Sequence, residues 1–217
     1  MTEYDKDAIV NPSVSEFIRR ELDSESPDLA NLREYANSNR VPILLPEAAA
    51  FLKVITQMHR PENVLEIGTA IGYSALLMAK NGAKHITTLE LDPQMVSIAR
   101  RNTEAYRYAI RVVEADARDY LPYMDEDETL DMIFLDGPKG HYINMLEESY
   151  RLLKKGGILL ADNILYKGMT FDDDYIQKRK TTIVKRLRAF IDTICNDGKW
   201  HASILTIGDG FVLAVKK

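Results

Sequence analysis

The chain has 217 residues, of which 46% are hydrophobic and 28% charged, and a formal net charge of −5. These proportions are typical of a soluble globular domain and exclude a disordered, collagen-like or coiled-coil protein. Apolar runs such as 158–161 are too short to cross a bilayer, and the single Cys195 excludes an internal disulfide. The acidic N-terminus shows no signal peptide, so we expect a cytoplasmic protein that does not bind membranes. The negative charge, taken alone, argues against a nucleic-acid surface.

The first part of the chain has the pattern of helices. Apolar residues recur at helical spacing in 13–22, and Pro27 and Pro46 stand at the first positions of two further helices. Between the second and third helices, 41–44 is predicted to be extended, because a residue before proline avoids the helical region. We therefore expect an N-terminal helical extension over residues 1–45.

From residue 63 onward, short apolar strands alternate with helical patterns, which is typical of βαβ units and a parallel sheet. The fold class is therefore α/β: one domain, 1–217, with N-terminal helices and a doubly wound, mostly parallel seven-stranded sheet ending in an antiparallel hairpin. A long helix, 176–194, is predicted before this hairpin, and Gly208, Asp209 and Gly210 form its turn. The predicted strands are 64–67, 85–90, 110–114, 130–135, 157–161, 201–207 and 211–215.

A glycine loop follows the first strand, at the edge where open α/β sheets bind ligands. Three residues separate Gly68 from Gly72, so the loop lacks the G-x-G-x-x-G pattern of dinucleotide-binding proteins. A plain strand-to-helix turn would use the same glycines. Glu90 ends the second strand, where an acid either binds a ribose diol or is simply solvated. Asp116 follows the third strand and either borders a ligand or caps the short helix after it.

Two carboxylates, an amide and a lysine follow the fourth and fifth strands. Asp136 and Lys139 come after one strand, and Asp162 and Asn163 come after the other. Because the carboxyl ends of parallel strands meet at one edge of a sheet, we expect these side chains to converge. Hard oxygen donors suit Mg²⁺, with water and substrate completing its coordination. A pair of helix caps is the structural alternative.

Together these segments resemble the metal-dependent class I O-methyltransferases, which use S-adenosylmethionine (SAM) and include catechol and caffeoyl-CoA methyltransferases. The resemblance extends from 41–43 to the last hairpin and depends on 64–74 and on the acids, amide and lysine just described. Only the pair Gly137 and Pro138 departs from the family pattern, because relatives more often have alanine or a polar residue there. Details at 162–168 and 208–210 look most like a bacterial branch that methylates 5-hydroxyuridine at the tRNA wobble position.

The resemblance implies a Rossmann-like fold with a SAM-binding core in 46–217, and a role for each matching residue. Lys139, with Asp136 beside it, is implied to be catalytic, as the base or as the charge that stabilises the substrate oxyanion. The implied Mg²⁺ ligands are Asp136, Asp162 and Asn163. The implied SAM contacts are Leu44, Glu66, Gly68, Ser74, Glu90, Asp116, Ala117 and Asp136.

The metal motif does not separate a catechol from 5-hydroxyuridine, because both place a hydroxyl beside a second oxygen. Six basic residues and no acid in 178–188 favour tRNA, since phosphate contacts require a local basic patch. A solvated helix face is the structural alternative. We therefore expect a tRNA substrate, with a small phenol as the alternative, and the family implies a homodimer. The expected RNA contacts are Lys167, Lys178, Arg179, Lys180 and Arg186.

Overall fold

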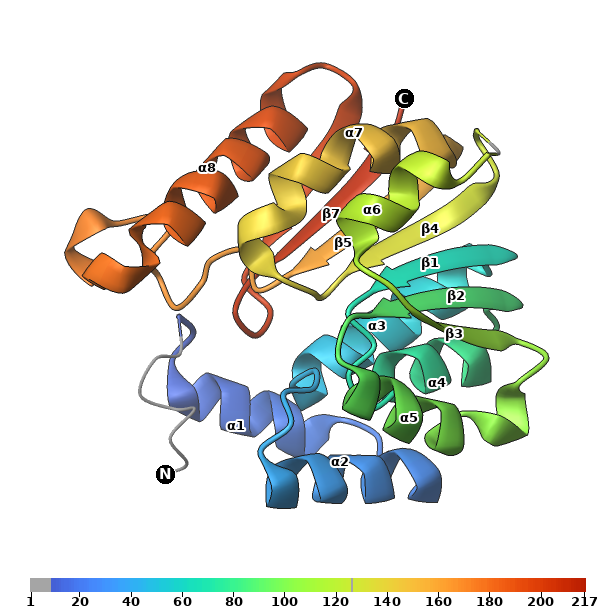
Figure 1. The fold of residues 1–217 in the computed structure, drawn as a ribbon. Coiled ribbons are helices and arrows are strands. Elements are labelled where there is room, and N and C mark those ends of the chain that lie inside the picture. The colour runs from blue at the N-terminus through green and yellow to red at the C-terminus, as the bar shows by residue number, and fades with distance from the viewer. Residues whose placement is uncertain (1–8, 126) are drawn as a thin grey trace.

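The computed structural model describes residues 9–125 and 127–217. One seven-stranded sheet has the strand order β3-β2-β1-β4-β5-β7-β6 (Figure 1). The first five strands are parallel, whereas β7 is antiparallel to both β5 and β6. The predicted fold class is therefore confirmed. The strands are β1 (Asn63–Ile67), β2 (His85–Glu90), β3 (Ile110–Glu114), β4 (Leu130–Leu135), β5 (Leu153–Asp162), β6 (Trp200–Leu205) and β7 (Phe211–Lys216).

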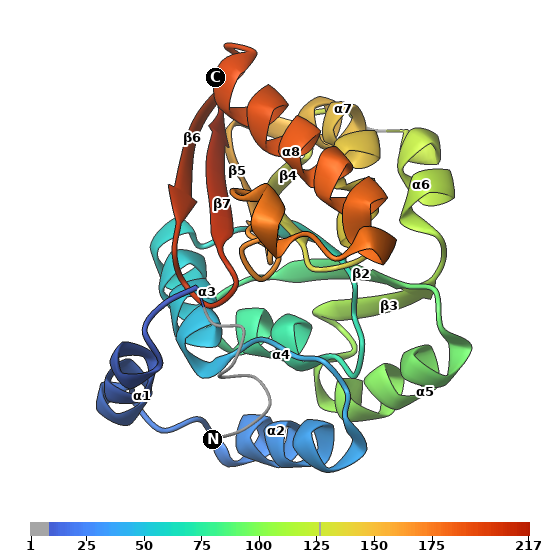
Figure 2. The same cartoon turned by 90° about the vertical axis from the view of Figure 1, so that its left-hand side faces the viewer.

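Helices cover both faces of the sheet (Figures 1 and 2). One face carries α3 (Pro46–His59), α4 (Tyr73–Lys80) and α5 (Pro93–Asn102), and the other carries α6 (Ala117–Tyr120), α7 (Tyr142–Leu152) and α8 (Thr181–Asn196). An outer layer consists of α1 (Pro12–Glu21) and α2 (Pro27–Asn39), which pack on α3 and α4 respectively. In the part of the chain that the structure describes, no helix has the length and apolar character needed to span a membrane.

The core has two hydrophobic clusters, one on each face of the sheet. Successive residues of β1 point to opposite faces, so Val64 packs into the cluster under α3 and α4, and Leu65 into the one under α7 and α8. The central strands, which are covered on both faces, are mostly apolar, as is usual in parallel sheets, and Glu66 of β1 is a buried exception. Leu29 and Ala36 of α2 belong to the first cluster, so the N-terminal helices share the core of the sheet.

The long helix before the hairpin begins later than predicted. The structure has short 3₁₀ turns at Asp173–Tyr175 and Lys178–Lys180, and α8 begins only at Thr181. The side chain of Asp172 caps the first of these turns by accepting from the Asp174 N–H at 2.9 Å. Local side-chain bonds of this kind compete with a helical backbone. The three basic residues 178–180 therefore lie in a turn and not on a helix face.

Candidate active site

A cavity of about 700 Å³ lies at the carboxyl edge of the parallel strands. Ile67 pairs with both Leu89 and Leu135, and Leu135 pairs with Ala161, so the four central strands end level with one another. The volume falls within the range of about 300–1,000 Å³ that is usual for small-molecule sites. The predicted site residues that line the cavity are Leu44, Gly68, Ser74, Glu90, Asp116, Ala117, Asp136, Lys139, Asp162, Asn163 and Lys167.

The glycine loop passes very close to the neighbouring strand end. Gly68 has φ +101°, and a Cβ atom at this position would lie 2.5 Å from the backbone oxygen of Asp136. Its N–H donates to the Leu89 carbonyl at 3.0 Å, and the Asp136 N–H donates to the Ile67 carbonyl at 2.9 Å. Only glycine combines this backbone conformation with so close an approach. Gly68 therefore lets the β1 loop and the first predicted metal ligand share one wall of the cavity.

Glu90, at the end of β2, binds the glycine loop that follows β1. One carboxylate oxygen accepts from the Ala70 N–H at 2.9 Å, and the other accepts from the N–H groups of Leu91 and Asp92 at 2.9 and 3.0 Å. The residue also lines the cavity. A carboxylate oxygen has more than one acceptor position, so these bonds leave room for a ribose hydroxyl.

Asp116 caps a helix and also borders the cavity. Its side chain accepts from the Arg118 N–H at 2.9 Å, which is the N-cap bond of α6, and it forms an ion pair with the Arg118 guanidinium at 2.6 Å. The hydrogen bonds from Arg118 lower the pKa of the Asp116 carboxyl to about 2. The capping role considered from the sequence is confirmed, and the carboxylate stays charged at the cavity wall.

Glu66 lies beneath the cavity and is not among its lining residues. It is fully buried, accepts from the Thr88 hydroxyl at 2.5 Å, and Thr88 in turn contacts the Thr69 hydroxyl at 2.6 Å. Its other oxygen, Oε1, is buried without a hydrogen bond in the described part of the chain. Burial raises the pKa of Glu66 to about 8, outweighing the nearby hydroxyls of Ser74 and Thr88. Glu66 therefore lies under the loop, and its expected direct contact with SAM stays a prediction.

This raised pKa predicts how stability changes with pH. Between pH 4.5 and about 8 the folded protein keeps a proton on Glu66 that the unfolded chain has released, so Glu66 lowers stability progressively as the pH rises through this window. We expect Glu66→Gln to remove this loss and to gain several kcal/mol over the wild type by about pH 8. Urea unfolding of both proteins at about pH 5 and about pH 8 measures this difference in unfolding free energy. A difference that is the same at both pH values would contradict the raised pKa of Glu66.

The predicted metal ligands come together at the ends of β4 and β5. The buried Tyr142 hydroxyl lies within hydrogen-bonding distance of the Leu135 and Asp162 carbonyls, at 3.0 and 3.2 Å, which ties the two strand ends together. Burial, and then the charge of Asp136, raise the pKa of Asp162 well above its ordinary value. Asn163 follows with φ +57°, and its N–H donates to Asp162 Oδ1 at 2.5 Å.

The partly buried carboxylate of Asp136 and the buried carboxylate of Asp162 repel one another, so a cation beside them would stabilise their charged forms. Lys139 Nζ lies 3.4 Å from Asp136 Oδ1 and supplies one positive charge. Burial nevertheless raises the pKa of Asp136, against the opposing charge of Lys139. Within 9–125 and 127–217, no three His, Cys, Asp or Glu side chains form a metal-binding group. The donor set of two carboxylates and the Asn163 amide fits an oxygen-seeking divalent cation that takes further oxygens from water or substrate.

The hairpin turn holds the loop that follows these ligands. The N–H of Ile164 donates to the Gly210 carbonyl at 3.1 Å, and the N–H of Leu165 donates to the Asp209 carbonyl at 3.0 Å. The Asp209 side chain accepts from the Lys167 N–H at 2.6 Å. Asp209 also lines the cavity. The sequence indicated this turn only as a hairpin, because nothing in its spacing shows that it reaches the site.

The basic residues are divided in a way that the sequence did not predict. Lys167 lines the cavity, but Lys178, Arg179, Lys180 and Arg186 do not. Arg186 donates to the Gly140 carbonyl at 3.3 Å. These residues therefore form no continuous basic helix face, contrary to the expectation, because the turn at 178–180 precedes α8, on which Arg186 is exposed.

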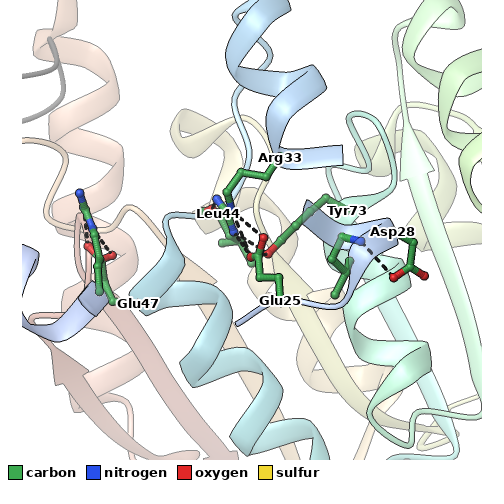
Figure 3. A network of polar contacts seen from close by, with 8 residues as sticks. Glu25, Asp28, Arg33, Leu44, Glu47 and Tyr73 are labelled. Atoms are coloured by element: carbon green, nitrogen blue, oxygen red, sulfur yellow. Dashed lines mark hydrogen bonds and ion pairs between the residues drawn. The ribbon is translucent and has the colours of Figure 1, made fainter. Parts of the chain in front are cut away.

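Two polar clusters, one at the cavity wall and one directly behind it, have no signal in the local sequence. Arg19 of α1 and Glu47 of α3 form a two-bond ion pair at 2.7 and 2.9 Å, and both line the cavity. Glu25, Arg33 and Tyr73 form a second cluster beside Leu44 (Figure 3). Each joins segments at least 28 residues apart, so no short motif could have revealed them.

The strand-end cavity and the sheet order are those of a SAM-dependent methyltransferase. The sequence profile of the O-methyltransferase family matches residues 20–217, so the chain belongs to this family.

Known relatives agree with this membership. The chain is 32% identical over 137 residues to a catechol O-methyltransferase of Niastella koreensis, a match that covers 59% of this chain and 61%, less than two thirds, of that relative. A catechol O-methyltransferase of Mycobacterium tuberculosis is 26% identical over 94% of this chain and 95% of its own length. The crystal structure of an O-methyltransferase from Bacillus cereus in complex with SAH has a TM-score of 0.82 at 25% identity, covering 94% of this chain and 97% of the other.

Proposed function

We propose that the protein is a Mg²⁺-dependent O-methyltransferase acting on a small aromatic compound with adjacent hydroxyls, as in a catechol. The observation that carries the proposal is the pair of carboxylates, the partly buried Asp136 and the buried Asp162, at the wall of a cavity of small-molecule size. The catechol O-methyltransferases among the relatives support this substrate class.

SAM, when bound, supplies a methyl group on a sulfonium centre. Leu44, Gly68 and Ser74 would hold its methionine end, and Glu90 its ribose, while Asp116 and Ala117 would border its adenine. The contacts of the described residues support this arrangement, since all six line one cavity. Glu66 would act from below, by supporting the loop through Thr88 and Thr69.

Asp136, Asp162 and Asn163 would hold Mg²⁺, which, when bound, lowers the pKa of a substrate hydroxyl and fixes its position. Lys139 would act beside it in one of two ways: as an ammonium whose charge stabilises the phenolate oxygen, or as a neutral amine that accepts the phenolic proton at Nζ. The ion pair with Asp136 keeps Lys139 near the metal ligands, because Lys139 Nζ lies 3.4 Å from Asp136 Oδ1. Much of the rate would come from holding the oxygen and the methyl group in reacting geometry.

Methylation of 5-hydroxyuridine in tRNA is the second candidate, favoured by one observation. Lys180 Nζ lies 5.8 Å from the ring centroid of Tyr166, a residue that lines the cavity, so the basic turn reaches the cavity rim. Arg188 does not add to this surface, because it donates to the Thr170 carbonyl at 2.8 Å and pairs with Asp173 at 2.7 Å. We therefore rank tRNA below a small phenol.

A paired assay tests the choice of substrate. We expect the purified protein, with SAM and Mg²⁺, to methylate a catechol with a kcat/KM at least about 10²-fold above that for tRNA carrying 5-hydroxyuridine. The triple variant Lys178→Ser, Arg179→Ser, Lys180→Ser is expected to keep the catechol activity. Faster methylation of the tRNA, lost in this triple variant, would overturn the choice.

Three further proposals remain. The family resemblance implies a homodimer, whereas the cysteine content indicates a cytoplasmic location and the residue patterns indicate the division at residue 45. Light scattering of the purified protein, with a mass near 49 kDa (twice the chain's 24.7 kDa), would support the dimer.

A further inference from the structure

Three polar side chains connect the N-terminal segment to the cavity wall. Arg33 of α2 donates to the Glu25 carboxylate, with a shortest bond of 2.6 Å from Nη2, and also donates to the Tyr73 hydroxyl at 2.5 Å. Tyr73 in turn donates to Glu25. The Arg33 guanidinium carbon lies 4.8 Å from the Tyr73 ring centroid (Figure 3). All three members of this cluster, which we call the Arg33 cluster, therefore bind one another.

The Arg33 cluster ends on two elements that line the cavity. Arg33 Nη1 donates to the Leu44 carbonyl at 2.8 Å, and Leu44 lines the cavity just before α3. Tyr73 is the first residue of α4, directly before Ser74, and both line the cavity. One guanidinium group thus fixes both sides of the proposed methionine pocket.

The cluster is built to stay charged and in place. Burial opposes ionisation of Glu25, but the bonds from Arg33 and Tyr73 outweigh it and lower the pKa of this carboxyl. Arg33 and Glu25 are mostly buried, with side-chain exposures of 19% and 24%. The planar guanidinium holds three partners at fixed angles, which a lysine ammonium cannot reproduce.

An ion pair also joins α2 and α4 without reaching the cavity. Lys80 of α4 pairs with Asp28 of α2 at 2.6 Å, and neither residue lines the cavity. Figure 3 draws this contact beside the Arg33 cluster. It therefore provides an internal control for the packing of α2 on α4.

We propose that Arg33 is a positioning residue for SAM, which acts by holding the Leu44 carbonyl and the start of α4 at the spacing the cofactor needs. The inference rests on the proposed cofactor contacts of Leu44 and Ser74. It assigns to the N-terminal helical segment an effect on cofactor affinity that acts through Leu44 and α4, since Arg33 itself lies outside the cavity wall.

Calorimetry with SAH and steady-state kinetics test the proposal on the full chain. We expect Arg33→Lys to raise the SAH Kd and the KM for SAM about tenfold, within the range of about 5–150-fold for coupled sites. The KM for the aromatic substrate should stay unchanged. Tyr73→Phe, which removes one hydroxyl, should give a smaller rise in the same direction. Lys80→Met should leave the SAH Kd unchanged.

Two results would overturn the positioning role. One is an Arg33→Lys protein that binds SAH as tightly as the wild type. The other is an equal loss of SAH affinity in Arg33→Lys and Lys80→Met, which would make the effect one of helix packing. The SAH measurement needs neither metal nor aromatic substrate, so failure of the proposed substrate class would leave it interpretable.

Discussion

We expect Asp162→Asn to lower methyl transfer about 10³-fold or more while leaving the metal-free protein at least as stable as the wild type. The activity falls because Mg²⁺ loses a charged ligand, and a bound metal contributes several kcal/mol to such a reaction. The stability does not fall because the asparagine removes a buried negative charge that faces Asp136 and keeps an oxygen for the Asn163 N–H. Kinetics with a catechol and thermal unfolding in EDTA measure the two effects.

A loss of activity without a loss of stability distinguishes a metal ligand from an acid that only stabilises the fold. Asp192→Asn is a matched control, because Asp192 is an exposed acid on α8 that accepts from the Asn196 side chain. We expect this control to change neither property. An Asp162→Asn protein that keeps most of its activity, or that unfolds well below the wild type in EDTA, would refute the assignment of Asp162.

We expect Gly68→Ala to lower the melting temperature by roughly 10 °C and to abolish SAH binding. The added Cβ would stand 2.5 Å from the Asp136 carbonyl oxygen at a backbone φ of +101°. Backbone strain and overpacking together cost about 2–6 kcal/mol, and 1 kcal/mol shifts the melting temperature of a chain of this size by about 2–4 °C. The displaced strand end carries Asp136, so the cavity wall moves with it.

Gly82→Ala isolates the contribution of the close approach. Gly82 has φ +108°, but a Cβ atom there would meet nothing within 4 Å. This variant therefore carries the backbone strain alone, and we expect it to bind SAH normally. Equal losses of stability in the two variants would show that the contact between Gly68 and the end of β4 has no special importance.

The part of the site at the strand ends was predictable from the sequence. The alternation of strands and helices gives a parallel sheet, and the carboxyl ends of its strands lie at one edge. Gly68, Glu90, Asp136 and Asp162 therefore line one cavity, as their positions after successive strands indicated. This reasoning needs only the order of the elements.

The remaining features depend on contacts between distant segments. Arg33 and Tyr73 are 40 residues apart and meet only because α2 packs on α4. Spacing along the chain cannot show this. The basic run at 178–188 was misplaced for a related reason: the sequence pattern extends the helix back to residue 176, whereas the Asp172 cap and two 3₁₀ turns delay its start to Thr181.

The central claim is that metal-dependent O-methylation takes place at the wall formed by Asp136 and Asp162. The most direct measurement is the initial rate of methyl transfer from labelled SAM to a catechol with Mg²⁺, with excess EDTA, and after Mg²⁺ is restored. We predict a rate that disappears in EDTA and returns in full with Mg²⁺. An unchanged rate in EDTA would contradict the claim.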